Sequence, residues 1–371
     1  MKKPLIFLIC SVLAYCGYGQ AQPVAQGTML SDAEKIFGLS KCWSEVKYNF
    51  VYFDRLTFDW DSLYQATIPV VLATANDFEY YRELQRFVAT LRDGHTSTFV
   101  AASTEQSMNF IAYSRIALEG KLNGSTRLTF KDVNNITVSN NGHRNPPEIP
   151  LFDFSVLGKN IGVLKIDNFW HKDFKAQFDS IYEKIGATDA LVIDLRGNGG
   201  GNTVNSEYVL SHLTNESYKM SIISSPRYIP AFASWNSPME WYVGEPWIGQ
   251  PVKNKPIYNK PAVLLIDEST FSAAENFCIG FRNMKRGSII GTPSGGSTGN
   301  PVFFSLPGGG SIRICTLKDT YPDGTEFVGV GILPDIEAPE TVSSFLSQLE
   351  TGIDNSNAKR KAIEVLKVDM K

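Results

Sequence analysis

The sequence predicts an α/β protein with an N-terminal helical subdomain and a small β-rich insertion. Residues 28–100 carry apolar side chains at helical spacing, and residues 101–157 hold short strand-like runs between Asn/Gly turns. Over residues 158–345, short apolar runs alternate with helical patterns, which is typical of a βαβ core rather than a sandwich. Residues 346–371 predict a helical C-terminal tail.

The N-terminal subdomain is predicted to consist of helices. Ser31 can cap the first helix and Asp77 a later one, each ahead of apolar residues that recur every three or four positions. Gly94 is placed to end the later helix, so that His95 would directly follow a rigid element. The stretches predicted to be helical are residues 31–50 and 59–92.

The core is predicted to alternate strands with helices in chain order. Its strand candidates are apolar enough to lie in the middle of a sheet. Strands are expected at residues 161–166, 190–193, 262–266 and about 287–291, and helices at about 174–185, 203–212 and from 272 onward.

Composition and spacing argue against several classes of function. A net charge of −3 over 371 residues, without basic clusters, argues against nucleic acid as a partner. Beyond the N-terminus the chain has no run long and apolar enough to span a bilayer, so an integral membrane protein is not expected. The spacings typical of metal ligands do not occur, and we predict neither a metal nor another cofactor.

Residues 1–21 are predicted to be a secretory signal peptide. Two lysines precede an apolar run, which ends in small residues of the kind that a signal peptidase recognises. Export to the periplasm or to the outside of the cell would follow. The later cysteines, Cys42, Cys278 and Cys315, have apolar neighbours and are predicted to be core residues rather than a disulfide framework.

A predicted strand–turn–helix at Ser272 is the first candidate for chemistry. The apolar run 262–266 ends in polar residues, and a helix of small residues begins at Ser272, with Glu275 at capping-box spacing. Such a serine has an exposed hydroxyl beside free backbone N–H groups, here that of Ala273, as in a nucleophile with half an oxyanion hole. The alternative is an ordinary N-cap serine, which the local sequence alone favours.

A glycine run after the strand at 190–193 is the second candidate. Gly199 or Gly200 could bring backbone N–H groups close to a ligand. A phosphate cradle is the competing interpretation, but the run lacks the Gly-Lys-Ser/Thr ending of a phosphate loop and the spacing of a dinucleotide fingerprint. Donation to an oxyanion fits better, with Asp194 and Arg196 expected to pair and hold the turn.

His95 is the third candidate. A serine nucleophile needs a base whose pKa is near neutrality, and histidine is the usual one. The chain has four histidines, and any one of them alone is more often a surface or packed residue. Only His95 follows a predicted helix end, in the segment Asp93-Gly94-His95-Thr96.

The chain resembles the C-terminal processing (tail-specific) serine protease family from about residue 30 to 340. Four motifs occur in the family's order: DGHT (93–96), DLRGNGGG (194–201), FSAAE (271–275) and GVGILPD (329–335). The resemblance implies a crotonase/ClpP-like ββα-spiral core, with Ser272 as the nucleophile.

The chain departs from the best-known branch of that family, whose members pair the serine with a lysine. In the matching stretch, residues 291–299, Ser297 stands in the lysine's place and the loop contains no lysine. The tricorn-like branch instead uses a histidine from the N-terminal part, which His95 matches, and a later carboxylate. Candidates for that carboxylate are Glu326 and, in reserve, Asp323.

The resemblance implies a serine peptidase that cleaves a peptide or protein substrate through an acyl-enzyme, and the predicted signal peptide implies that it is exported. Many relatives carry a PDZ-like module between the histidine and the glycine run, and the interval here predicts a truncated or absent one. Two alternatives remain, a non-catalytic peptide or lipid binder on the same fold and an esterase using the same serine. The residues implied are Ser272, His95 and Glu326 as the triad, with Gly199, Gly200 and Ala273 at the oxyanion hole.

Overall fold

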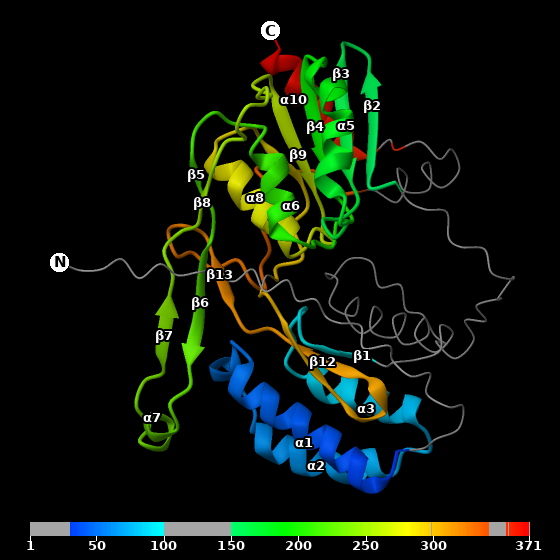
Figure 1. The fold of residues 1–371 in the computed structure, drawn as a ribbon, viewed down its shortest axis with the longest axis vertical. Helices are drawn as coiled ribbons and strands as arrows, with labels where there is room; N and C mark the ends of the chain where they lie inside the picture. Colours follow the sequence, from blue (N-terminus) through cyan, green and yellow to red (C-terminus); the bar gives the residue numbers. More distant parts are fainter. Residues whose placement is uncertain (1–29, 100–149, 298, 341–353, 355, 371) are drawn as a thin grey trace, which may run out of the picture.

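The computed structural model describes residues 30–99, 150–297, 299–340, 354 and 356–370. The predicted signal peptide, most of the predicted β-rich insertion and much of the C-terminal tail lie outside the described residues. Within them, the protein has a mixed α/β fold with N-terminal helices, as predicted (Figure 1).

A six-stranded sheet forms the core. In spatial order its strands are β14 (Ile336–Glu337), β10 (Ile289–Gly291), β9 (Ala262–Ile266), β4 (Ala190–Asp194), β3 (Ile161–Ile166) and β2 (Phe152–Leu157). Neighbours pair in parallel, except that β2 is antiparallel to β3. Residues 152–157 are predicted to belong to the insertion, but they pair in register with β3. The core sheet therefore begins before residue 158.

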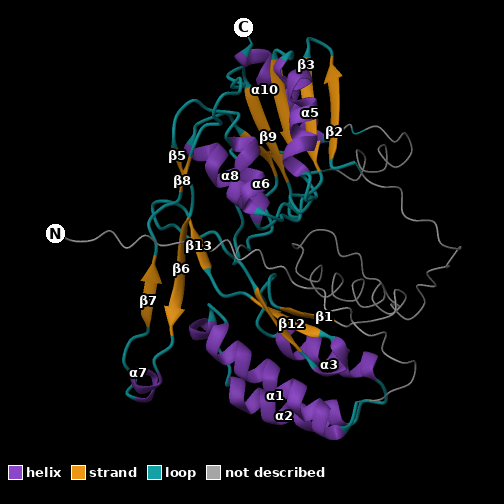
Figure 2. Ribbon diagram, viewed as in Figure 1, coloured by secondary structure: helices purple, strands orange, loops and turns teal. Residues whose placement is uncertain are grey.

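Helices cover both faces of this sheet (Figures 1 and 2). They are α5 (Phe174–Gly186), α6 (Thr203–Leu210) and α8 (Ala273–Asn283) on one face and α10 (Asn357–Asp369) on the other. Successive side chains of a strand point to opposite faces. In β9, Leu264 and Ile266 therefore pack with the first three helices, whereas Val263 and Leu265 pack with α10.

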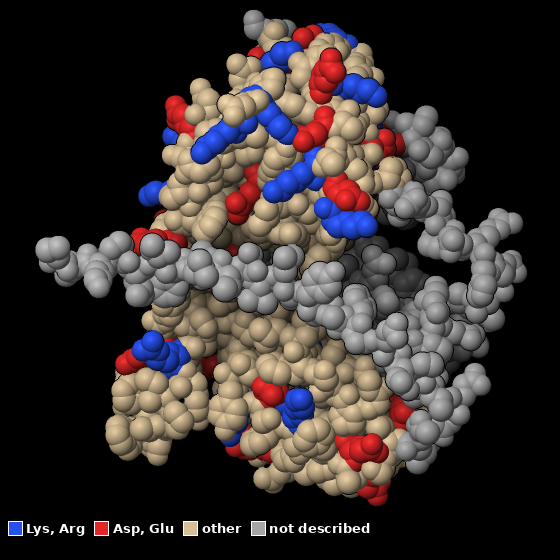
Figure 3. All heavy atoms as spheres, in the orientation of Figure 1, with Lys and Arg blue, Asp and Glu red and all other residues tan. Residues whose placement is uncertain are grey.

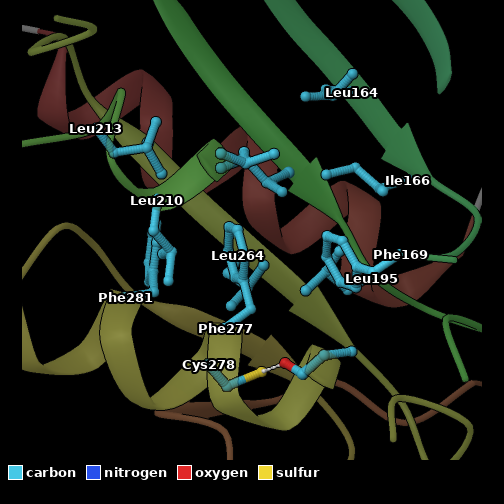
Figure 4. Packing of buried hydrophobic residues seen from close by; sticks show 14 of the residues in the cluster. Leu164, Ile166, Phe169, Leu195, Leu210, Leu213, Leu264, Phe277, Cys278 and Phe281 are labelled. Atoms are coloured by element: carbon cyan, nitrogen blue, oxygen red, sulfur yellow. Dashed lines mark hydrogen bonds between the residues drawn. The ribbon is translucent and has the colours of Figure 1, made fainter. Parts of the chain in front are cut away.

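Cys42, Cys278 and Cys315 are buried, as predicted. Cys278 lies in the layer drawn in Figure 4, beside Phe277 of α8 and below Leu264 of β9. Its thiol donates to the carbonyl of Ala274 at 3.1 Å. The Asp194–Arg196 pair is also confirmed, with 2.6 Å between the guanidinium and the carboxylate.

Three long helices, a short 3₁₀ helix and a short strand make up the described N-terminal region. They are α1 (Asp32–Asn49), η1 (Phe53–Arg55), α2 (Trp60–Leu72), α3 (Asp77–Ala89) and β1 (Ser97–Phe99). Ser31 caps α1 in a capping box, as predicted. Asn76, rather than Asp77, caps α3, because its side-chain oxygen accepts the N–H of Glu79 at 2.9 Å. His95 follows α3 after a short turn.

A three-stranded sheet joins the N-terminal region to the core. β1 pairs with β12 (Ser311–Ile314), which pairs with β11 (Val302–Ser305), all antiparallel. Helices α1, α2 and α3 share a hydrophobic cluster with β12. β1 lies beside β12 (Figure 1). Because β11 follows the core loop that contains Ser297, this pairing brings His95 to that loop.

In the sequence, the remaining elements come between β4 and β9 or between β10 and β14. A projecting hairpin, β6 and β7, carries α7 at its tip and pairs with β13 near the core (Figure 1). These elements are β5 (Tyr218–Lys219), β6 (Ile222–Arg227), α7 (Pro230–Ser234), β7 (Glu240–Val243), β8 (Ile248–Gly249), η3 (Pro307–Gly309) and β13 (Lys318–Thr320).

Candidate active site

Ser272 has a strained backbone conformation at the start of α8. Its φ of 58° and ψ of −121° differ from the extended conformation of an ordinary N-cap residue. A non-glycine residue held in a sparsely populated region costs on the order of 1–3 kcal/mol and persists only where its neighbours enforce it. A sharp, strained turn is how some hydrolases expose a nucleophilic serine. The geometry therefore favours the nucleophile over the ordinary N-cap.

Neighbouring groups enforce the conformation of Ser272. Its N–H donates to the Glu275 carboxylate at 2.9 Å and to the Ser297 carbonyl at 3.2 Å. Gly200 packs directly against the turn with a φ of 93°. A Cβ at Gly200 would lie 2.5 Å from the Phe271 carbonyl oxygen and 2.8 Å from the Ser272 Cβ, so only glycine fits there.

The backbone N–H groups beside Ser272 are not equivalent. The N–H of Gly200 donates to the Asn198 side-chain oxygen at 2.9 Å. Among the described residues, no acceptor is found for the N–H of Ala273 or of Gly199. Of the three predicted oxyanion-hole residues, Gly199 and Ala273 therefore keep a donor for a ligand. Gly200 instead provides the space for the close approach.

The backbone of His95 is held from two sides. Its N–H donates to the Asp93 carboxylate at 3.1 Å, and its carbonyl accepts from Nε of Arg313 at 2.7 Å. The same guanidinium donates to the carbonyl of Gly94 at 3.2 Å. The imidazole stacks on the ring of Phe271, which precedes Ser272, with 4.7 Å between the ring centroids.

The His95 ring contacts Ser297 rather than a carboxylate. Nδ1 lies 2.7 Å from Oγ of Ser297, and both residues are only 3% exposed. Burial, and then the nearby Arg313 charge, lower the pKa of His95 to about 3, so the ring is neutral at neutral pH. No hydrogen bond joins this ring to the Ser272 hydroxyl within the described part of the chain, but Ser297 contacts both residues.

The sequence predicts Glu275 only as a capping-box residue, but its buried side chain accepts hydrogen bonds from four groups of the site. Its carboxylate accepts the N–H groups of Ser272 and Ser297 on one oxygen, and the Ser294 hydroxyl and the Gly296 N–H on the other. Complete burial raises the pKa of Glu275 to about 7 despite these four donors. The sequence signal was the glutamate in FSAAE, which is an unusual residue for a helix face that packs on a sheet.

The carboxylates of Glu326 and Asp323 have partners other than His95. The Glu326 carboxylate pairs with Arg55 at 2.6 Å and with Lys318 at 3.0 Å. Burial alone would raise the pKa of Glu326, but these two cations lower it overall. Asp323 accepts the N–H of Thr325 in its own exposed turn at 2.9 Å. The structure thus gives both carboxylates other partners and does not bring either one to His95.

Within the described ranges, no group of acidic, histidine and cysteine side chains is arranged to hold a metal. The helices of the described chain all fall short of the length or apolarity needed to cross a bilayer. On the face drawn in Figure 3, basic and acidic side chains are interspersed over the core rather than gathered by sign. Among the described residues on that face, charge therefore marks no docking site.

Three solved structures share this fold. One is a protein from Parabacteroides merdae assigned as a peptidase, at 19% identity and a TM-score of 0.63, covering 91% of this chain and 97% of that one. Another is mature CPAF, at 14% identity and a TM-score of 0.61, covering 91% of this chain and 97% of the CPAF chain. The tricorn protease matches at 10% identity and 0.52, covering 92% of this chain and 37% of the tricorn chain.

The sequence of the core matches a known family. Residues 160–338 match the model of peptidase family S41. This range contains Ser272, Glu275 and Ser297, whereas His95 lies before it. The match identifies residues 160–338 as a serine peptidase domain of family S41.

Proposed function

We propose that the protein is an endopeptidase in which Ser272 is the nucleophile and His95 is the general base. The observation that carries this proposal is the strained Ser272, which is linked through Ser297 to the buried His95 ring and lies beside the free N–H of Ala273. A peptide or protein is the substrate, and no cofactor takes part. We further propose that the chain belongs to the tricorn-like branch without the catalytic lysine, on a crotonase/ClpP-like ββα-spiral.

The reaction is an acyl transfer. Because Nδ1 of His95 faces Ser297, Nε2 is the nitrogen left to accept the proton of Ser272 as its Oγ attacks the peptide carbonyl carbon. The N–H groups of Ala273 and Gly199 stabilise the oxyanion, and each such donor is worth about 3 kcal/mol of barrier. Protonated His95 then gives its proton to the leaving amine. Water, deprotonated by the same ring, hydrolyses the acyl-enzyme.

The strained turn also contributes to reactivity. The fixed φ of Ser272 holds the residue in place before a substrate binds, so little conformational entropy is lost on the way to the transition state. The ring of His95 is neutral at neutral pH because burial keeps its pKa low, so it has a lone pair that can accept a proton. Export through the signal peptide would place this activity in the periplasm or outside the cell.

A fluorophosphonate probe and a peptide library test the proposal. The wild type should be labelled at Ser272 and should cleave peptides, and Ser272→Ala should do neither while remaining folded. Ser269→Ala is the matched control, because that serine is exposed on the same turn. Folded wild-type protein that is never labelled would favour a binding protein. Fast cleavage of short acyl esters without peptide cleavage would favour an esterase.

A further inference from the structure

The His95 ring has an unusual partner for a serine hydrolase. In a Ser-His-Asp triad, the ring nitrogen remote from the nucleophile donates to a buried carboxylate. Here the group at Nδ1 is the Ser297 hydroxyl, at 2.7 Å. Ser297 and His95 are both almost fully buried, so water does not compete freely for this contact. A neutral hydroxyl therefore takes the place that a charged group takes in the triad.

Ser297 is fixed by contacts that do not involve His95. Its N–H donates to the Glu275 carboxylate at 3.0 Å, and its carbonyl accepts the N–H of Ser272. The preceding residue, Gly296, donates to the other oxygen of the same carboxylate at 2.7 Å and accepts from Gly329, also at 2.7 Å. The position of the Ser297 backbone is therefore set by the core rather than by the histidine.

An apolar side chain, a positively charged one and two carboxylates that are bonded to other groups lie near the ring. Phe271 covers one ring face, and Arg313 of β12 lies close enough to lower the pKa of His95. Asp93 contacts the N–H of His95, and Glu275 lies behind Ser297, bonded to its backbone. Within the described chain, Ser297 is thus the side chain that can hold the hydrogen of Nδ1.

We propose that Ser297 is the positioning residue of His95. Its Oγ accepts the Nδ1 hydrogen, which keeps the lone pair on Nε2 and fixes the angle of the ring toward Ser272. This inference rests on the proposed function of His95 as base. The opposite arrangement, in which the hydroxyl donates to Nδ1, would place the hydrogen on Nε2 and leave no acceptor for the Ser272 proton.

The arrangement predicts a distinct response to pH. A hydroxyl orients the ring but adds no negative charge, so it does not favour the protonated ring as a carboxylate would. His95 should therefore remain neutral well below pH 6.5, and its ring nitrogen signals should not titrate there. A ring with a carboxylate at Nδ1 would titrate nearer its usual pKa.

Nitrogen-15 NMR of the histidine rings tests the contact without relying on activity. The chain has only four histidines, and His95→Gln identifies the signals of His95. The wild type should show the hydrogen on Nδ1, and Ser297→Ala should show a mixture of tautomers. Ser294→Ala is the matched control, because that hydroxyl donates to Glu275 in the same loop without touching the ring. Its His95 signals should match the wild type.

Kinetics give the second readout. Ser297→Ala should lower kcat by roughly 10–100-fold with KM within about twofold, because the ring loses its orientation but the substrate contacts remain. Ser297→Thr, which keeps the hydroxyl, should recover most of this loss if it folds. A wild-type ring with the hydrogen on Nε2, or an unchanged kcat in Ser297→Ala, would overturn the proposal, as would a probe that labels Ser297. A wild type that is never labelled would instead defeat the proposed function, and the NMR result would still stand.

Discussion

The two halves of the site are built in different ways. The core half contains Ser272, whose conformation is set by Glu275 three residues later and by the glycine loop at the end of a neighbouring strand. The N-terminal half contains His95, whose ring and carbonyl are held by Ser297 and Arg313, each more than 200 residues further along the chain. The nucleophile depends on close steric fit within the core, and the base depends on the pairing of β1 with β12.

This difference predicts where substitutions will act. Changes in the core half should disturb the nucleophile and the stability of the core together, because strain and packing are shared there. Changes in the N-terminal half should misplace the base while leaving Ser272 in its conformation. The four substitutions that follow, in order of decreasing expected effect, test this comparison.

Gly200→Ala should have the largest effect. The new Cβ would meet the Phe271 carbonyl oxygen at 2.5 Å and the Ser272 Cβ at 2.8 Å, so the turn must move. We expect activity to fall by at least about 10³-fold and the free energy of unfolding by about 3 kcal/mol. Gly197→Ala is the control, because its φ is also positive but its Cβ meets nothing within 4 Å. Activity assays and denaturant melts compare the two variants. Equal losses of activity and of stability in both would show that the close approach of Gly200 to the Ser272 turn is not what matters.

Glu275→Gln should lower activity by about 10²-fold, because an amide replaces one of two acceptor oxygens that each receive two donors. Its effect on stability should depend on pH. Burial raises the pKa of Glu275 from 4.5 to about 7, so the folded state binds the proton more tightly than the unfolded state. This contribution is complete below about pH 4.5 and is lost as the pH rises through 7.

Melts of the wild type and Glu275→Gln between pH 4.5 and 8 measure that contribution. The free energy of unfolding of the wild type should fall by about 3 kcal/mol relative to that of the variant as the pH rises, because 2.5 pKa units correspond to about that energy. A constant difference over this range would mean that Glu275 titrates normally and is less isolated from water than the structure indicates.

Arg313→Lys should lower kcat by about 10-fold. One ammonium cannot replace the two guanidinium contacts to the carbonyls of His95 and Gly94, so the base should lose its fixed position. Arg286→Lys is the control, because Arg286 also holds two carbonyls, those of Tyr258 and Lys260, on the far side of the core. Steady-state kinetics should separate the variants, and an equal loss of kcat in both would point to general destabilisation.

Glu326→Gln should have the smallest effect. Its ion pairs with Arg55 and Lys318 are partly exposed, so we expect less than about twofold change in activity and less than about 1 kcal/mol in the free energy of unfolding. Glu240→Gln, which removes another exposed pair on the β6–β7 hairpin, should behave alike. A loss of activity near 100-fold would instead indicate that Glu326 orients His95.

The sequence predicted most of the core correctly because its signals are local. The strands at 161–166 and 262–266 are apolar on both faces, and the structure buries them between helices. The caps at Ser31 and at the start of α8 depend on residues three positions apart. The prediction at residues 152–157 failed because pairing with β3, rather than local pattern, assigns that strand to the core sheet.

By itself, the sequence determined the α/β core, the place of Ser272 between a strand and a helix, and the family motifs that single out His95. Only the tertiary structure decided what surrounds the imidazole. A hydrogen bond to that ring requires an angle and a distance of a few ångströms, and these depend on how β1 pairs with β12 rather than on any nearby residue. For that reason the sequence made Glu326 a reasonable candidate, whereas in the structure the side chain that contacts the His95 ring is Ser297.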